Sequence, residues 1–249
     1  MSRVLLIDAD VLAYRTACAV EKATEWEPGY WTWFCDENDV KRAISEEIDR
    51  IMAKTEGHSY KLCLTDTVNW RMDVLPTYKG KRANVKKPLV LKPIRQWLLE
   101  ARGATMRPNL EGDDVMGILA TWSGLKGDKI IVSIDKDMKT IPGLYLRTLD
   151  DDVIELTEDE ADYWHMFQTL MGDSTDGYSG CPGVGPKKAE AILEGVPSGD
   201  RWNAVVMVYA DKKLGEEEAL TQARVARILR ASDFNFKTKE PILWTPPSN

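Results

Sequence analysis

The sequence predicts an α/β fold, in which a parallel β-sheet is covered by helices on both faces. Short apolar runs of strand length alternate along the chain with longer segments whose apolar residues have helical spacing. Parallel strands need such crossover segments, because a tight turn can join only antiparallel strands. With 249 residues, of which 43% are hydrophobic, the chain is long enough for one large domain, or for one domain with a smaller appendage.

The individual elements follow from apolar spacing and from stop signals. In chain order we expect a strand over 4–7, helices over 11–19 and 40–54, a strand over 61–65, helices over 94–101 and 111–123, a strand over 129–134, and helices over 158–171, 202–209 and 216–231. Asp10 is a suitable N-cap for the first helix, and Gly57 and Gly103 follow two others as stops. The aromatic span 21–36 supports no assignment.

Carboxylates follow the predicted strands at the point where each strand ends. Asp8 and Asp66 come directly after the first two strands, and Asp135 and Asp137 come directly after the third. In open parallel sheets, ligands bind outside the carboxyl ends of the strands. The three strands are therefore expected to deliver these acids to one rim of the sheet.

Two further groups of acids lie outside the predicted strands. Glu111 and Asp114 are three residues apart and share a helix face, with Asp113 beside them, and Asp173 and Asp176 lie in the turn after the helix over 158–171. The alternative for the first group is that it only complements the positive end of the helix dipole.

Brought together, the acids would repel one another unless cations lay among them. Hard oxygen ligands favour Mg²⁺ or Mn²⁺, whereas zinc would need histidine or cysteine. The only histidines are His58 and His165, and neither has a metal-binding neighbour motif. The pattern therefore indicates a divalent-metal site and chemistry on phosphates.

The net charge of −7 would by itself argue against a nucleic-acid partner. However, the segment from Val74 to Leu99 contains no acidic residue. Its cations are Lys79, Lys81, Arg82, Lys86, Lys87, Lys92 and Arg95. This segment either binds nucleic-acid phosphates or is an ordinary solvated charged face.

A glycine-rich turn lies near residue 185. Gly183 and Gly185 allow a tight turn, Pro186 suits the first position of a helix, and Lys187 and Lys188 add positive charge near the free amides of that helix. The turn is neither a Walker A loop nor a dinucleotide fingerprint. It matches a hairpin between two helices that holds a DNA backbone without reading sequence; a plain helix-turn-helix packing unit is the alternative.

The cysteines and the N-terminus bear on localisation. Cys18, Cys35, Cys63 and Cys181 are widely spaced, which indicates neither a zinc site nor disulfides and suits a reduced cytoplasm. The first apolar run is too short for a signal peptide, and no stretch of eighteen apolar residues exists. We therefore expect a soluble cytoplasmic protein that does not bind a membrane.

Together these motifs resemble the flap endonuclease and 5′-3′ exonuclease superfamily, in the family's order along nearly the whole chain. The strand-end Asp8, the Lys-Gly-Lys-Arg run at 79–82, the Glu-Gly-Asp-Asp run at 111–114, Asp-Lys-Asp at 135–137 and the segment 172–185 carry the resemblance. The runs at 65–71, 110–117 and 177–180 are most similar to the gene 6-type exonuclease of short-tailed bacteriophages.

The resemblance implies a PIN-like catalytic domain over 1–165 with a helical arch, and a helix-three-turn-helix and C-terminal helical region over 166–249. The arch candidate is 79–94, although Pro88 and Pro93 interrupt it as a helix. Lys79 and Arg82 match the basic catalytic positions at the foot of the arch. Two or more Mg²⁺ ions, which Mn²⁺ can replace, are expected among Asp8, Asp66, Glu111, Asp113, Asp114, Asp135, Asp137, Asp173 and Asp176. The expected DNA-binding residues are Arg71, Lys81, Lys86, Lys87, Gly183, Gly185, Lys187 and Lys188.

The implied function is a magnesium-dependent 5′-3′ exonuclease that acts on duplex DNA at a 5′ end, nick or flap and releases 5′-phosphorylated products. Flap cleavage, and removal of RNA from RNA–DNA hybrids, are variants of the same chemistry. The implied setting is phage DNA replication, primer removal or host DNA degradation in the bacterial cytoplasm. The alternatives are a PIN-type ribonuclease and a non-catalytic DNA-binding accessory protein. The sequence does not determine the oligomeric state.

Overall fold

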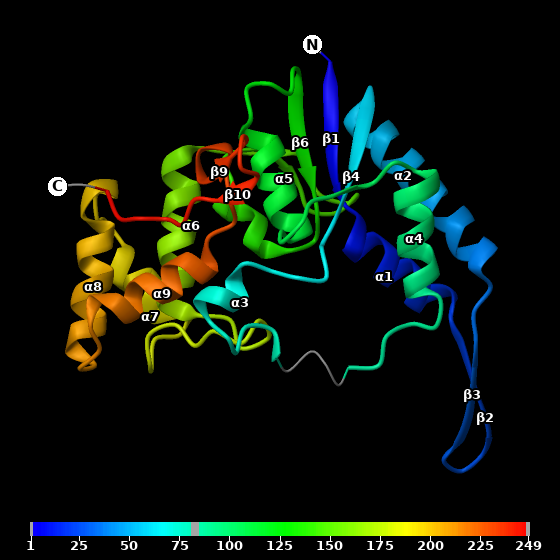
Figure 1. Ribbon diagram of the computed structural model, residues 1–249, viewed down its shortest axis with the longest axis horizontal. Helices are drawn as coiled ribbons and strands as arrows, with labels where there is room; N and C mark the ends of the chain where they lie inside the picture. Colours follow the sequence, from blue (N-terminus) through cyan, green and yellow to red (C-terminus); the bar gives the residue numbers. More distant parts are fainter. Residues whose placement is uncertain (1, 81–84, 248–249) are drawn as a thin grey trace.

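A computed structural model describes residues 2–80 and 85–247 (Figure 1). Its centre is a six-stranded sheet with the order β5-β4-β1-β6-β7-β8. The strands are β1 (Arg3–Asp8), β4 (Ser59–Leu64), β5 (Thr105–Met106), β6 (Asp128–Val132), β7 (Gly143–Leu146) and β8 (Ile154–Leu156). The first five run parallel, and only β8 pairs antiparallel, with β7. The predicted α/β class with a parallel sheet is confirmed.

Helices cover both faces of the sheet, as the alternation of side chains along β1 requires. Leu5 and Ile7 pack against α1 (Ala9–Val20), α2 (Glu37–Thr55) and α4 (Leu91–Ala101). Val4 and Leu6 point the other way and pack against α5 (Gly112–Thr121). Figure 1 shows the first three helices on one side of the sheet and α5 on the other.

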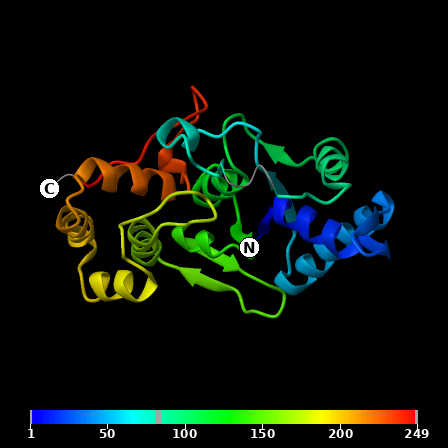
Figure 2. The same cartoon turned by 90° about the horizontal axis from the view of Figure 1, so that it is seen from below.

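The C-terminal part forms a third cluster of helices beyond α5, which Figure 2 shows from below. Its elements are α6 (Glu158–Met171), α7 (Pro186–Leu193), α8 (Arg201–Asp211), α9 (Glu216–Ala226) and the short strands β9 (Phe234–Asn235) and β10 (Glu240–Pro241). The expected boundary at residue 165 lies inside α6. Ile228 and Leu229, from the expected second region, pack in the same core cluster as α5. The residues just after α9 are therefore part of the core that supports the sheet, whereas α6 to α9 enclose a core cluster of their own.

One local expectation differs from the structure, and two regions that the sequence left open are described in whole or in part. The unassigned span contains a hairpin of β2 (Lys22–Glu27) and β3 (Tyr30–Phe34), which projects from the body in Figure 1. All of its strand residues are exposed, so no buried face produced a periodic pattern. Asp8, and not Asp10, caps α1 by accepting a hydrogen bond from the Val11 amide.

The arch candidate over 79–94 is the second of these regions, and Pro88 and Pro93 were expected to interrupt it as a helix. Within the described part of the segment 79–94, no α-helix begins before Leu91. Pro88 explains this locally, because the residue before a proline is biased away from helical conformation and the proline lacks an amide donor. Lys81 and Arg82 lie outside the described residues.

Among the residues described, no helix is both long and apolar enough to cross a membrane.

Candidate active site

The carboxyl edge of the sheet gathers carboxylates from β1, from the loop after β6 and from the start of α5. Asp8 is buried at the end of β1, where Ser133 Oγ donates a hydrogen bond of 2.7 Å to its Oδ2. β1 and β6 are adjacent in the sheet, and this hydrogen bond joins their two ends. Burial, aided by the nearby Asp135, raises the pKa of Asp8 above its usual value.

The loop after β6 is a short 3₁₀ helix, η2 (Lys136–Thr140), which holds two acids side by side. The Asp137 amide donates to Asp135 Oδ1 at 2.9 Å, so Asp135 caps this helix. Gln168, on α6, donates to Asp137 Oδ1 at 2.5 Å. Burial, together with the charge of Asp135, raises the pKa of Asp137 to about 7.

Asp113 lies among other acids, and the charge of Lys79 offsets only part of theirs. It lies in the first turn of α5, and no hydrogen bond or ion pair to it is found within residues 2–80 and 85–247. Burial raises its pKa well above the usual value, and the charges of Asp8, Asp135 and Glu111 raise it further. Any cation that binds between Asp113 and these three acids would stabilise the charged form of Asp113.

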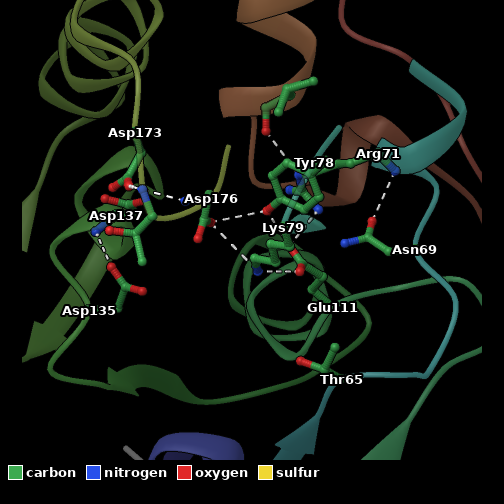
Figure 3. A network of polar contacts seen from close by, with 12 residues as sticks. Thr65, Asn69, Arg71, Tyr78, Lys79, Glu111, Asp135, Asp137, Asp173 and Asp176 are labelled. Atoms are coloured by element: carbon green, nitrogen blue, oxygen red, sulfur yellow. Dashed lines mark hydrogen bonds and ion pairs between the residues drawn. The ribbon is translucent and has the colours of Figure 1, made fainter. Parts of the chain in front are cut away.

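Glu111 is held by three donors from the segment around residue 75. Arg71 Nη1 lies 3.1 Å and Tyr78 Oη 2.9 Å from Glu111 Oε2, and Lys79 Nζ contacts Glu111 Oε1 (Figure 3). Lys79 Nζ also lies 3.6 Å from Asp176 Oδ2. Burial alone would lower the pKa of Lys79, but Glu111 and Asp176 raise it, so the lysine is a stable cation.

The turn that carries Asp173 and Asp176 packs against the segment that contains Tyr78 and Lys79. The Lys79 amide donates to the Asp176 carbonyl at 2.6 Å. Gly177 adopts a φ of 81°, and a Cβ there would lie 2.8 Å from the Thr77 carbonyl oxygen. Burial would raise the pKa of Asp173, but the amides that its carboxylate accepts from Thr175 and Asp176 lower it. Because a side chain at position 177 would collide with the Thr77 carbonyl, only a glycine permits the turn to approach this backbone segment so closely.

Two of the nine predicted carboxylates do not join this group. Asp66 accepts hydrogen bonds from the Thr67 and Asn109 amides and so closes the loop that leads to α5. Asp114 is fully buried, and both of its oxygens accept bonds from Arg71, at 2.7 and 2.8 Å. Burial would raise the pKa of Asp114, but the Arg71 guanidinium lowers it. The hydrogen bonds of both acids are therefore structural, and neither acid joins the carboxylate group of the site.

Arg71 also differs from its expected role as a DNA contact. It is 2% exposed, and it donates to the Val225 and Arg227 carbonyls at the end of α9 as well as to Asp114. A buried guanidinium that faces inward cannot touch a duplex at the surface. The expectation is corrected, because the sequence showed a cation in a basic neighbourhood but not the depth of the side chain.

The other predicted DNA-binding residues that the structure describes lie at the surface. Gly183 and Gly185 are in an exposed loop before α7, Lys187 and Lys188 are exposed in its first turn, and Lys188 Nζ donates to the Gly183 carbonyl at 2.9 Å. Lys87 is exposed as well. Lys86 pairs with Glu21 at 3.1 Å, and its ammonium lies 3.9 Å from the centre of the Trp33 ring, so it joins the basic segment to the β2–β3 hairpin.

Three residues of the site went unrecognised in the sequence. Tyr78 bridges Glu111 and Asp176, Ser133 supports Asp8, and Gln168 supports Asp137. Tyr78 and Ser133 each adjoin a predicted motif, which was the available signal. Gln168 had none, because its partner is 31 residues away on another element.

The donor set fits a hard divalent cation by its chemistry. Every candidate ligand is a carboxylate oxygen, and burial, together with the neighbouring acids, raises the pKa values of Asp113 and Asp137. In the described part of the chain, no three histidine, cysteine, aspartate or glutamate side chains lie so that they could hold a metal ion without moving. Lys79 instead supplies positive charge to Glu111 and Asp176.

Comparison with known proteins identifies relatives along nearly the whole chain. Residues 3–169 match the family model of the 5′-3′ exonuclease, N-terminal resolvase-like domain. The chain is similar to the exodeoxyribonuclease of Enterobacteria phage T3, with 32% identity, and to the exonuclease of Escherichia phage T7, with 33% identity. Each match covers 98% of this chain and 93% of the relative.

Two solved phage T5 structures share the fold. One is the 5′-exonuclease with bound zinc ions, with a TM-score of 0.63, 15% identity, and coverage of 90% of this chain and 89% of the other. The other is the flap endonuclease in a pseudo-enzyme–product complex with DNA and metal ions, with a TM-score of 0.63, 15% identity, and coverage of 90% and 88%. With a family model over more than half of its length and relatives above 30% identity along nearly all of it, the chain belongs to the 5′-3′ exonuclease family of nucleases.

Proposed function

We propose that the chain is a Mg²⁺-dependent 5′-3′ exonuclease that hydrolyses phosphodiester bonds of duplex DNA and releases products with 5′-phosphates. The observation that carries this proposal is the convergence of Asp8, Asp113, Asp135 and Asp137 at the carboxyl edge of the sheet, with Lys79 beside them. Family membership supports hydrolysis from a 5′ end. The metal, the substrate and the product end are our inference.

The residues that would hold the metal are Asp8, Asp113, Asp135 and Asp137, with Glu111, Asp173 and Asp176 binding directly or through water. The raised pKa values of Asp113 and Asp137 support this, because a cation among the acids would favour their charged forms. When bound, two such ions lower the pKa of a water molecule and stabilise the leaving 3′ oxygen. The zinc ions bound to the T5 5′-exonuclease support divalent-metal binding, and we expect Mg²⁺ with Mn²⁺ as a substitute.

Lys79 is the residue that would act on the phosphate. Its ammonium has three donors, and contacts with Glu111 and Asp176 leave one free for a non-bridging phosphate oxygen. The raised pKa keeps it charged through the working pH range, so it stabilises negative charge that develops on the phosphate. Tyr78 would position Glu111 and Asp176 through its hydroxyl. Arg82 is proposed, from the motif alone, to steer the 5′ phosphate.

The duplex would be held at the turn before α7. Gly183 has a φ of 75° with open space at its Cβ, so the loop backbone is open to a phosphate. The exposed Lys187 ammonium, and the N–H groups of Lys188 that do not bond the Gly183 carbonyl, would face the same phosphate. Such contacts position the backbone without reading sequence. Lys86 and Lys87 would extend the contact along the basic segment. The T5 product complex with DNA supports DNA as the partner.

Changing Lys187 and Lys188 together to alanine tests this surface. Loss of two phosphate contacts should weaken duplex binding and reduce the slope of log K against log salt by roughly 2. Binding is measured by fluorescence anisotropy at several salt concentrations. Lys212 and Lys213, also exposed, provide the matched control double variant. An unchanged salt slope in the Lys187/Lys188 variant would remove the α7 turn from the interface.

Product analysis tests the activity as a whole. End-labelled duplex, nicked, flapped and RNA-primed substrates, with Mg²⁺, report polarity, product end and RNA removal in one experiment. We expect 5′-phosphorylated products from the 5′ end, with flap cleavage and RNA removal from hybrids as further activities suited to phage replication, primer removal or host DNA degradation. The Asp113→Asn/Asp135→Asn variant should lose at least about 10²-fold in kcat. Full activity in that variant would exclude the carboxylate group as the metal site, and cleavage of single-stranded RNA alone would favour a PIN-type ribonuclease.

A further inference from the structure

A cavity of about 310 Å³ adjoins the carboxylate group but lies outside it. It opens at the ends of β1, β6 and β7, on the face covered by α1 and α2. Asp8 and Ser133 form the wall that it shares with the active site, and none of Tyr78, Lys79 or Glu111 lines it. The mechanism proposed above uses no other part of this space.

The floor of the cavity is apolar. Ile7, Val132 and Leu146 come from the three strand ends, and Leu12 and Ile51 come from the two helices. These side chains are buried in the core cluster on this face, which fixes the floor rigidly. A flat apolar group would find a preformed surface here.

The mouth of the cavity carries three arginines and two acids. Arg15 from α1, Arg50 from α2 and Arg147 just after β7 line it, together with Glu47 and Asp150. Arg50 pairs with Glu47 at 3.4 Å. Neither Arg15 nor Arg147 has a hydrogen bond or ion pair within the described ranges 2–80 and 85–247, and both are exposed. Within the described residues, Arg15 and Arg147 thus place two guanidinium groups without direct ion pairs at the rim of an apolar hollow. This arrangement favours an anion with an apolar part, since guanidinium binds phosphate in a two-pronged geometry.

We propose that this cavity binds a nucleoside 5′-monophosphate, with the base on the apolar floor and the phosphate at Arg15 and Arg147. The volume is at the lower end of the range of roughly 300–1,000 Å³ that is usual for small-molecule pockets, which suits one nucleotide. The inference rests on the proposed function, because hydrolysis from a 5′ end would release a nucleotide of this class beside Asp8. The released nucleotide then leaves the enzyme through this cavity. Nucleotide that remains bound there inhibits the nuclease.

Calorimetric titration of the full chain tests the site, in EDTA so that phosphate cannot bind through a metal. The probes are deoxyadenosine 5′-monophosphate, inorganic phosphate and deoxyadenosine. We expect the nucleotide to bind more tightly than either fragment, and the Arg15→Ala/Arg147→Ala variant to bind it about tenfold more weakly or worse, since two charge-assisted contacts are lost. Arg42→Ala, on the exposed side of α2, is the matched control and should leave binding unchanged.

A second readout excludes a general effect on DNA binding. With labelled duplex as substrate, the inhibition constant of the nucleotide should rise in the Arg15→Ala/Arg147→Ala variant while the KM for DNA stays the same. Phosphate that binds as tightly as the nucleotide, or nucleotide affinity that is unchanged in the double variant, would overturn the proposal. A rise in KM for DNA equal to the rise in the inhibition constant would overturn it as well.

The outcome is separable from that of the nuclease proposal. A chain that cleaves DNA but binds the nucleotide no better than phosphate keeps its proposed function and loses this site. A chain that binds the nucleotide through Arg15 and Arg147 but releases no product from any DNA end keeps the site and loses the proposed function. Because both arginines are exposed and without partners, their removal should leave the unfolding temperature unchanged, which thermal unfolding checks.

Discussion

Replacing Arg71 with methionine should destabilise the whole protein, because this buried guanidinium joins three parts of the chain. It donates to both oxygens of Asp114 at 2.7 and 2.8 Å, to Glu111 at 3.1 Å, and to the Val225 and Arg227 carbonyls at 2.9 and 2.6 Å. Methionine fills much of the same volume but donates no hydrogen bond. The variant therefore removes polar contacts while it changes the packing little.

The size of the effect follows from what remains buried. Asp114 is fully buried and Glu111 is 3% exposed, so the loss of Arg71 leaves buried carboxylate charge without its main partner. Removing one partner of a buried ion pair costs about 3–5 kcal/mol. For a chain of this size, each kcal/mol shifts the unfolding temperature by about 2–4 °C, so we expect a decrease of roughly 6–20 °C.

Chemical and thermal unfolding, followed by circular dichroism, measure this effect. Arg42→Met is the control, because Arg42 makes only exposed pairs with Asp39 and Glu46 and should cost less than about 0.5 kcal/mol. Adding Asp114→Asn to Arg71→Met should recover part of the loss, because the uncompensated charge is removed. A cost below about 1 kcal/mol for Arg71→Met, or strict additivity in the double variant, would refute the role of Arg71 as the buried counter-ion.

Two further predictions concern the acids and the turn beside them. The pKa of Asp137 is raised to about 7 from 3.8, so the folded protein holds a proton that the unfolded chain has released, and stability falls as pH rises between these values. In EDTA, Asp137→Asn should therefore unfold at a higher temperature than wild type at pH 8 but not at pH 4. With Mg²⁺ in place of EDTA, the difference in unfolding temperature at pH 8 should be smaller. Equal differences at both pH values in EDTA would contradict this prediction. Gly177→Ala should cost about 1–3 kcal/mol and lower activity, because its positive φ and the Thr77 carbonyl 2.8 Å from the new Cβ strain the turn. Gly199→Ala, which meets nothing within 4 Å, is the control, and equal unfolding temperatures for the two variants would show that the turn relaxes freely.

The parallel sheet and the strand-end acids were predictable because burial on both faces leaves a continuous apolar run in the sequence. The apolar run that ends at Asp8 and the one that ends before Asp135 are predicted to be parallel strands. Their carboxyl ends could therefore be placed at one edge of the sheet from the predicted topology alone. The β2–β3 hairpin could not be predicted in this way, since its aromatic side chains are exposed on both faces. Its stability comes from pairing between the strands and from the contact of Lys86 with Trp33, neither of which has a periodic signal.

The different positions of Asp113 and Asp114 within the run at 111–114 were not predictable from the sequence either. Helical spacing places Glu111 and Asp114 on one face but does not say whether that face meets solvent or core. The structure turns Asp114 toward Arg71 and leaves Asp113 toward Asp8. The partner that decides this lies 43 residues away in the sequence and is reached only after the chain has folded.

The position of Lys79 depends on the backbone as much as on its side chain. Its φ of 54° is unusual for a residue other than glycine and costs free energy that the surroundings must supply. The hydrogen bond from its amide to the Asp176 carbonyl and the close approach of Gly177 to Thr77 fix this conformation. The turn at 173–178 leads directly into the loop that ends at α7. Because main-chain contacts join the two segments, the backbone would set the distance between the proposed duplex site at α7 and the proposed phosphate site at Lys79. We predict that a shift of the turn moves the point of cleavage along the DNA.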